Sequence, residues 1–112
     1  MFRQTSPTHL KIGRGLILHL IYLAAANNAL SPDEPTTMNK NVLVIAMEDL
    51  KTLPRDEDLR ANLRYLEDKG YVQVEWTHDG TGDFKWVKLL PSGTDLVEGS
   101  TTDPGILFQR RQ

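Results

Sequence analysis

The chain of 112 residues contains no cysteine, which excludes disulfide bridges and thiolate metal sites and suits a reducing compartment. It has no excess of one charge either, because 13 basic residues stand against 15 acidic ones and the net charge is −2. Its longest apolar run, LILHLIYLAAA, is interrupted by His19 and is shorter than the ~20 residues that cross a bilayer. These features predict a single small globular domain with no membrane partner.

Recognisable catalytic and cofactor motifs are also missing. His9, His19 and His78 are scattered, and no two of them have the i, i+4 spacing of a helical metal site. Gly13-x-Gly15 lacks a third glycine and follows no strand, so it is not a dinucleotide loop. Neither a phosphate-binding G-x-x-x-x-G-K-[ST] loop nor a G-x-S-x-G nucleophile elbow occurs. The sequence predicts a protein that is not an enzyme, with no catalytic residue, cofactor or metal.

The charges that are present are unevenly distributed. Residues 1–32 carry three basic residues and no acid, residues 33–109 carry all 15 acids, and Arg110 and Arg111 lie at the end of the chain. A polyanionic partner would therefore contact local basic patches, with help from the termini.

Apolar spacing predicts three helices in the first part of the chain. The first is expected at about residues 9–28 and is apolar over more than half its circumference, which indicates burial on more than one side. The third ends at Gly70, a residue suited to a left-handed helix cap. The second is expected to run from Met38 to Leu50. Its predicted inward face consists of Met38, Val42, Ile45, Ala46 and Leu50.

After Gly70 the apolar period changes from 3.6 to 2, which predicts a hairpin. Val72–Trp76 alternates apolar and polar residues, and residues 84–90 form the return strand with Val87 and Leu89 inward. The intervening loop contains the glycines that a hairpin turn requires. A short helix is expected to begin at Pro91.

Three stretches of this chain resemble the winged helix-turn-helix family. They are LRANLRYLEDKGYV as a helix leading into a strand, the glycine-rich HDGTGD as a wing, and the closing segment LLPSGTDLVEG, in which Leu90 replaces the usual threonine. The resemblance implies an α+β fold with a three-helix core, a two-stranded wing and a short C-terminal helix. It covers residues 9–99, with a flexible arm at residues 1–8 and an irregular basic tail at residues 100–112.

A narrower resemblance concerns LRANLRYLEDKGYV, GTDLVEG and the following PGI, which together are similar to small winged-helix proteins of Mu-like phages and prophages. It implies a protein of the bacterial or phage-infected cytoplasm, encoded near packaging or morphogenesis genes, with a phage or host protein as a further partner.

In a winged helix the third helix enters the DNA major groove. If Leu59, Leu63 and Leu66 point inward, Arg60 and Arg64 share an outward face. The return strand adds basic and aromatic side chains that can contact a nucleic acid or form a protein-binding hot spot. The residues expected to contact duplex DNA are Arg55, Arg60, Arg64, Lys85, Trp86 and Lys88.

Other features of the same surface oppose DNA binding. Residues 55–69 carry five acids against four bases, and the wing tip at residues 78–83 has two acids and no lysine or arginine. The arginines of the helix could pair with acids three or four residues away, and Trp76 could simply cover the core. Two functions remain open: a regulatory or packaging-related protein that binds the DNA backbone, and an interaction adaptor that does not bind DNA.

The apolar first helix also predicts a homodimer, because a helix apolar on two sides needs two partners. The candidate interface residues are Leu16, Leu18, Ile21 and Tyr22. The alternative is that the other helices cover this surface within one chain.

Overall fold

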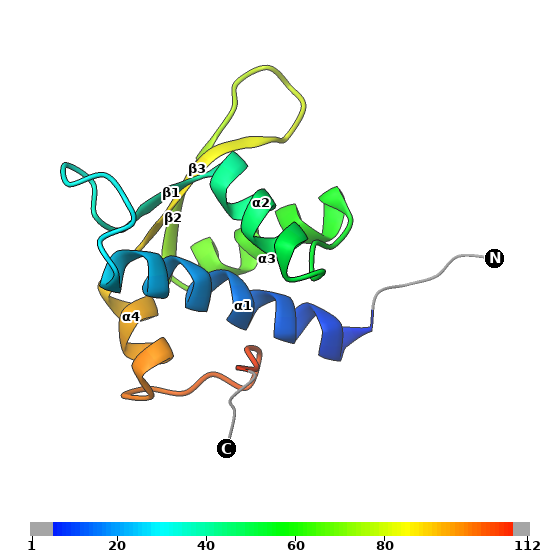
Figure 1. Ribbon diagram of the computed structural model, residues 1–112. Coiled ribbons are helices and arrows are strands. Elements are labelled where there is room, and N and C mark those ends of the chain that lie inside the picture. Colours follow the sequence, from blue (N-terminus) through cyan, green and yellow to red (C-terminus); the bar gives the residue numbers. More distant parts are fainter. Residues whose placement is uncertain (1–5, 109–112) are drawn as a thin grey trace.

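The computed structural model describes residues 6–108, which form four helices and one antiparallel sheet of three strands (Figure 1). In chain order the elements are α1 (Pro7–Ala26), β1 (Thr37–Asn39), α2 (Lys40–Asp49), α3 (Asp56–Asp68), β2 (Val72–Trp76), β3 (Phe84–Leu89) and α4 (Pro91–Glu98). The strand order is β1-β3-β2. This α+β arrangement is compatible with a winged helix-turn-helix. None of the described helices is both long and apolar enough to cross a membrane.

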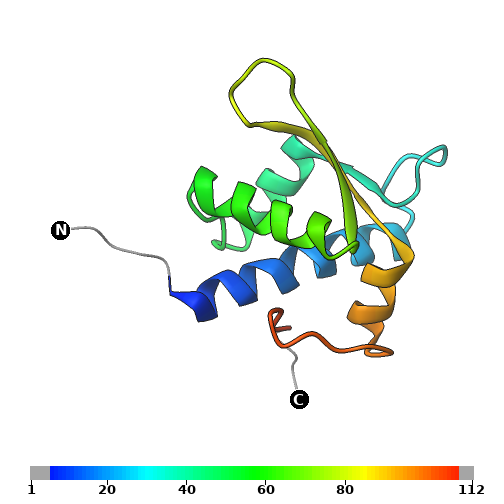
Figure 2. The same cartoon turned by 180° about the vertical axis from the view of Figure 1, so that it is seen from behind.

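Helix α1 is the central element of the domain. It lies between α2 and α3 on one side and α4 with the following segment on the other (Figures 1 and 2). Ser6 caps its N-terminus, because the side-chain oxygen accepts a hydrogen bond from the His9 N–H at 3.2 Å. Residues 7 and 8, predicted to belong to a flexible arm, therefore form the first turn of the helix. Residues 1–5 lie outside the described part of the chain.

Two glycines allow α1 to approach its neighbours closely. A Cβ atom at Gly15 would collide with the backbone carbonyl of Leu107, and one at Gly13 would lie 2.7 Å from the side-chain nitrogen of Asn62. The Leu107 N–H donates a hydrogen bond to the Lys11 carbonyl at 3.1 Å. Glycine within a helix costs ~1 kcal/mol relative to alanine, and here it permits close packing in exchange.

The predictions for the second helix are wrong in two respects. Its first residues instead form β1, where Met38 pairs with Val87 of β3, so the sheet has three strands rather than two. The helix buries Leu43 and Met47, whereas Val42 and Ile45 are 47% and 57% exposed. The physical reason is that residues 42–47 are all apolar, so their spacing does not define which side faces the core.

Strand β3 buries Val87 and Leu89, as predicted from their alternation. Phe84 is also buried although its position has the opposite parity. Glu75 pairs with Trp86 while Trp76 pairs with Phe84, so Lys85 is the extra residue of a β-bulge that changes the alternation.

The segment after α4 has no helix or strand up to residue 108, yet it packs on the domain. Ile106 is buried, and the Arg14 Nη1 donates a hydrogen bond to the Gly105 carbonyl at 2.9 Å. The Tyr71 hydroxyl donates to Asp103 at 2.7 Å, and this bond raises the pKa of Tyr71 to about 12. The predicted tail at residues 100–112 is thus held against the core as far as Phe108; Arg110 and Arg111 lie outside the described residues.

Substitution of Gly15 by alanine tests this close packing. We expect Gly15→Ala to lower the free energy of unfolding by about 1–3 kcal/mol, because the new methyl group must push away a backbone carbonyl. Gly13→Ala is the matched control, since it meets only the end of a side chain and should cost less. Urea denaturation followed by circular dichroism measures both. A Gly15→Ala variant as stable as the wild type would contradict the packing of the C-terminal segment on α1.

Candidate nucleic-acid interface

Helix α3 begins with three acidic residues in its first turn, which interact favourably with its dipole. Arg55, at the N-cap, lies 3.2 Å from the Glu57 carboxylate and 3.3 Å from that of Asp58. The charge of Arg55 is therefore balanced locally. Of the predicted DNA contacts, it is the one most directly surrounded by acids.

The outward side of α3 carries the other two candidate arginines. Leu59, Leu63 and Leu66 are buried as predicted, which leaves Arg64 exposed and Arg60 half-buried. Within residues 6–108, neither arginine forms an ion pair. The alternative, in which acids of the same helix form ion pairs with both arginines, is therefore not observed among these residues.

Glu67, one of those acids, contacts the strand β2 instead. Its carboxylate accepts hydrogen bonds from the Val74 N–H at 3.2 Å and from the Trp76 Nε1–H at 3.0 Å. The Trp76 ring packs edge-on against Phe84, with a centroid distance of 6.4 Å, and the Arg64 guanidinium carbon lies 5.0 Å from the Trp76 centroid. Trp76 thus covers the core at the base of the wing and also positions Arg64.

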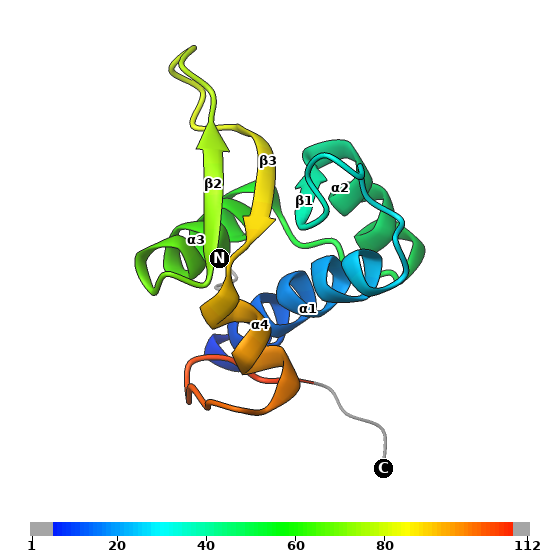
Figure 3. The ribbon, with the colours of Figure 1, turned by 90° about the vertical axis from the view of Figure 1, so that its left-hand side faces the viewer.

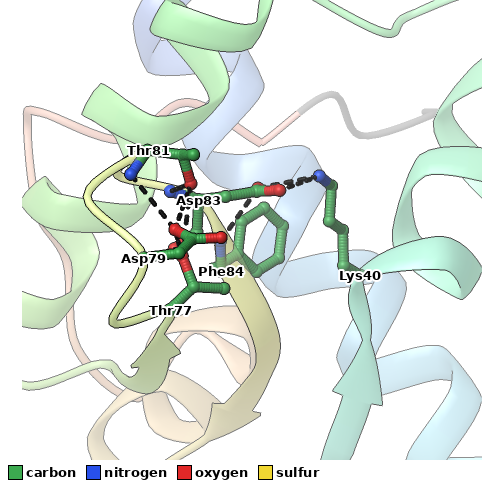
Figure 4. Close-up of polar contacts among 6 residues, drawn as sticks. All are labelled: Lys40, Thr77, Asp79, Thr81, Asp83 and Phe84. Carbon is green, nitrogen blue, oxygen red and sulfur yellow. Dashed lines mark hydrogen bonds and ion pairs between the residues drawn. The ribbon is translucent and has the colours of Figure 1, made fainter.

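The base of the wing is joined to α2 by an ion pair (Figure 4). The Lys40 Nζ lies 2.6 Å from the Asp83 Oδ2, and the Phe84 N–H donates to the Asp83 Oδ1 at 2.9 Å. The hydrogen bond from Lys40 and that from the Phe84 N–H lower the pKa of Asp83, and the Arg60 charge adds to this effect. Three cations, from α2 and α3, therefore surround or flank the wing: Lys40, Arg60 and Arg64.

The tip of the wing is organised around Asp79 (Figure 4). The hydroxyls of Thr77 and Thr81 donate hydrogen bonds to its Oδ1 at 2.8 and 2.6 Å. The Thr81 and Thr77 bonds lower the pKa of Asp79 to about 2, so the wing tip carries a negative charge at neutral pH.

Figure 3 shows β2 and β3 with α3 behind them. Trp86 and Lys88 alternate with the buried Val87 and Leu89, so they lie on the outer side of the sheet. Trp86 is half-buried between Asn39 of β1 and Glu75 of β2, and Lys88 is exposed on the same side. Lys85 is exposed at the bulge. These three side chains belong to the sheet, whereas Arg60 and Arg64 belong to α3 beside the wing.

Three residues of this surface were not predicted from the sequence: Lys40, Glu67 as a contact of β2, and Asp83 as the partner of Lys40. The mutual positions of Lys40 and Asp83 depend on β1, which the sequence did not indicate. Glu67 could have been suspected from its position in the last turn of α3, two residues before the C-cap Lys69 and close to the strand that follows.

Of the residues proposed for a dimer interface, Leu18 and Ile21 are 0% exposed within their own chain. Leu16 and Tyr22 are half-buried, and the Tyr22 hydroxyl donates to the Glu98 carboxylate at 2.9 Å, a bond that raises the pKa of Tyr22. In this conformation most of α1 is covered by its own domain. The homodimer itself stays a prediction.

No protein-family model matches the chain, and no curated protein does. Among solved structures, the circadian clock associated protein Pex from Anabaena is similar, with a TM-score of 0.48 and 16% sequence identity over 79% of this chain and 72% of that chain.

The Lys40–Asp83 ion pair predicts a dependence of stability on pH. Because the folded-state pKa of Asp83 is lowered, the pair stabilises the fold above the ordinary aspartate pKa, and this contribution is lost as the pH falls through the folded value. We expect Asp83→Asn to destabilise the protein at pH 7 by under ~1 kcal/mol, since the pair is about one-third exposed, and to have little effect once the pH is below the lowered folded-state pKa of Asp83.

Urea denaturation at a series of pH values measures this difference, with Asp95→Asn on α4 as a control for a general loss of negative charge. If Asp83→Asn changes the free energy of unfolding equally at pH 7 and in acid, the charge of the Asp83 carboxylate does not contribute to stability.

Proposed function

We propose that this chain is a non-enzymatic, winged-helix protein that binds duplex DNA through α3 and the wing, mainly by contacts to the phosphate backbone. The observation that carries the proposal is the position of Arg60 and Arg64 on the outward side of α3, beside the wing and without an ion pair inside the described chain. Arginines so placed are available to phosphate oxygens.

Backbone contacts are favoured over base readout for an electrostatic reason. A recognition helix directs its N-terminal residues at base edges, and here that end carries Asp56, Glu57 and Asp58. The ionised Asp79 at the wing tip is equally unsuited to a narrow minor groove. Arg64 lies about two turns further along α3, away from the three acids of its first turn.

The remaining candidates have supporting roles in the proposal. Lys85 and Lys88 add exposed charge along β3, and Trp86 offers an aromatic surface between them. Arg55 is expected to contribute least, because Glu57 and Asp58 already balance it. Lys40 also contacts the DNA if a phosphate group replaces Asp83 as its ion-pair partner.

Within this proposal the protein is a transcriptional regulator or a phage packaging or morphogenesis accessory, acting in the cytoplasm of a bacterium or of a phage-infected cell. The phage role rests on the sequence resemblance to proteins of Mu-like phages alone. The second candidate function is a protein-interaction adaptor on the same fold, favoured by the acids of the α3 N-terminus and wing.

Titration of a labelled random duplex with the protein, followed by fluorescence anisotropy, separates the two functions. We expect micromolar binding at 50 mM salt that weakens steeply with salt, because phosphate contacts release counterions. The variant Arg60→Glu/Arg64→Glu should lose at least tenfold in affinity. Asp83→Asn should bind severalfold more tightly, because Lys40 and Arg60 lose an acidic neighbour.

The matched control is Lys11→Glu/Lys51→Glu, which makes the same change in net charge on α1 and on the turn before α3. It should keep nearly the wild-type affinity. Equal losses in both double variants would indicate attraction by net charge alone, and no binding at 50 mM salt would exclude the DNA function in favour of the adaptor.

A further inference from the structure

Exposed apolar side chains are concentrated on α2 and on the residues that follow it. Within the described chain, six large apolar residues are substantially exposed, and four of them lie between residues 42 and 53. Those four are Val42, Ile45, Leu50 and Leu53. Val42 and Ile45 are one helical turn apart, so they form a continuous apolar patch on the outward side of α2, whereas Leu50 and Leu53 follow the end of the helix.

This patch is not required by the core of its own domain. The side of α2 that packs inward is occupied by Leu43 and Met47, which are 0% and 1% exposed. Val42 and Ile45 lie on the opposite side and are about half exposed. A helix that is apolar on both sides is stabilised by a second partner.

The charges of α2 are opposed to its own dipole. Glu48 and Asp49 lie in the last turn, where negative charge is unfavourable, and neither forms an ion pair with a described residue. The first turn contains no acid, and the side chain of the N-cap residue Asn39 makes no capping hydrogen bond. The only carboxylate bonded to this end of α2 among the described residues is Asp83, which pairs with the Lys40 side chain, so no acidic side chain of α2 itself lies beside the N–H groups of its first turn.

We propose that the outward side of α2 binds the same helix of a second copy of this chain, antiparallel, across a two-fold axis near Ile45. An antiparallel arrangement brings Glu48 and Asp49 of each copy to the N-terminal end of the other α2. It also covers Val42 and Ile45 of both copies. The same charges that destabilise an isolated α2 therefore stabilise the pair.

The surface differs from the one predicted on α1, where Leu18 and Ile21 are covered by their own chain. The contact is small, since each copy contributes the two apolar side chains of Val42 and Ile45. We therefore expect an association in the micromolar range or weaker, below that of obligate dimers. Arg60 and Arg64 are not part of this surface, so dimer formation and DNA binding are tested by separate variants.

Introduction of a single cysteine gives a direct test, because the chain has none. A residue near a two-fold axis meets its own copy, so we expect Ile45→Cys to form a disulfide-linked dimer in a glutathione redox buffer at 100 µM protein. Leu23→Cys, at a position on α1 that is 41% exposed, is the matched control and should stay monomeric. Equal crosslinking of the two variants, or none in Ile45→Cys, would overturn the proposal.

Sedimentation equilibrium of the cysteine-free protein provides the second measurement. The wild type should dimerise reversibly, Ile45→Glu should be monomeric with an unchanged circular dichroism spectrum, and Leu23→Glu should dimerise like the wild type. The variant Glu48→Lys/Asp49→Lys should dissociate at least fivefold more readily. A wild type that stays monomeric at 1 mM, or a dimer that Ile45→Glu does not weaken, would refute the interface. Tighter association of Glu48→Lys/Asp49→Lys would refute the antiparallel arrangement.

Discussion

The structure depends on the close approach of α1 to the elements on both of its sides. Ile17, Leu18 and Ile21 have no exposed surface, so this one helix supplies the centre of a core that α3, α4 and the sheet complete. In its N-terminal half, Gly13 and Gly15 have no side chain, so the helix there packs directly against the Asn62 side chain and the Leu107 backbone. In a domain of this size no second layer exists to compensate for a misplaced α1.

The element order could be predicted from the sequence because most segments carry an unambiguous period. Helix α3 has leucines at helical spacing and β3 has alternating apolar residues, so the inward residues Leu59, Leu63 and Leu66 of α3 and Val87 and Leu89 of β3 were predicted correctly. Helix α2 is different, because residues 42–47 are all apolar and any side could face the core. Strand β1 has three residues, and its pairing with β3 is a tertiary contact that leaves no local pattern.

The candidate site was predictable only in part, for related reasons. The outward positions of Arg60 and Arg64 follow from the helical period. Their lack of ion pairs does not, because Glu67 could equally have bonded within its own helix rather than to Trp76 and β2. The partnership of Lys40 with Asp83 joins residues 43 positions apart, which a single sequence cannot reveal.

The hydrogen bond from the Val74 N–H to Glu67 has a consequence for solubility. Strand β2 lies at the edge of the sheet, where unpaired backbone groups can recruit a strand from another molecule and begin aggregation. Glu67 occupies the central donor of that edge and places a carboxylate in the path of an approaching strand. Glu67, which links α3 to the base of the wing, thereby also hinders the addition of a strand from another molecule to the edge of the sheet.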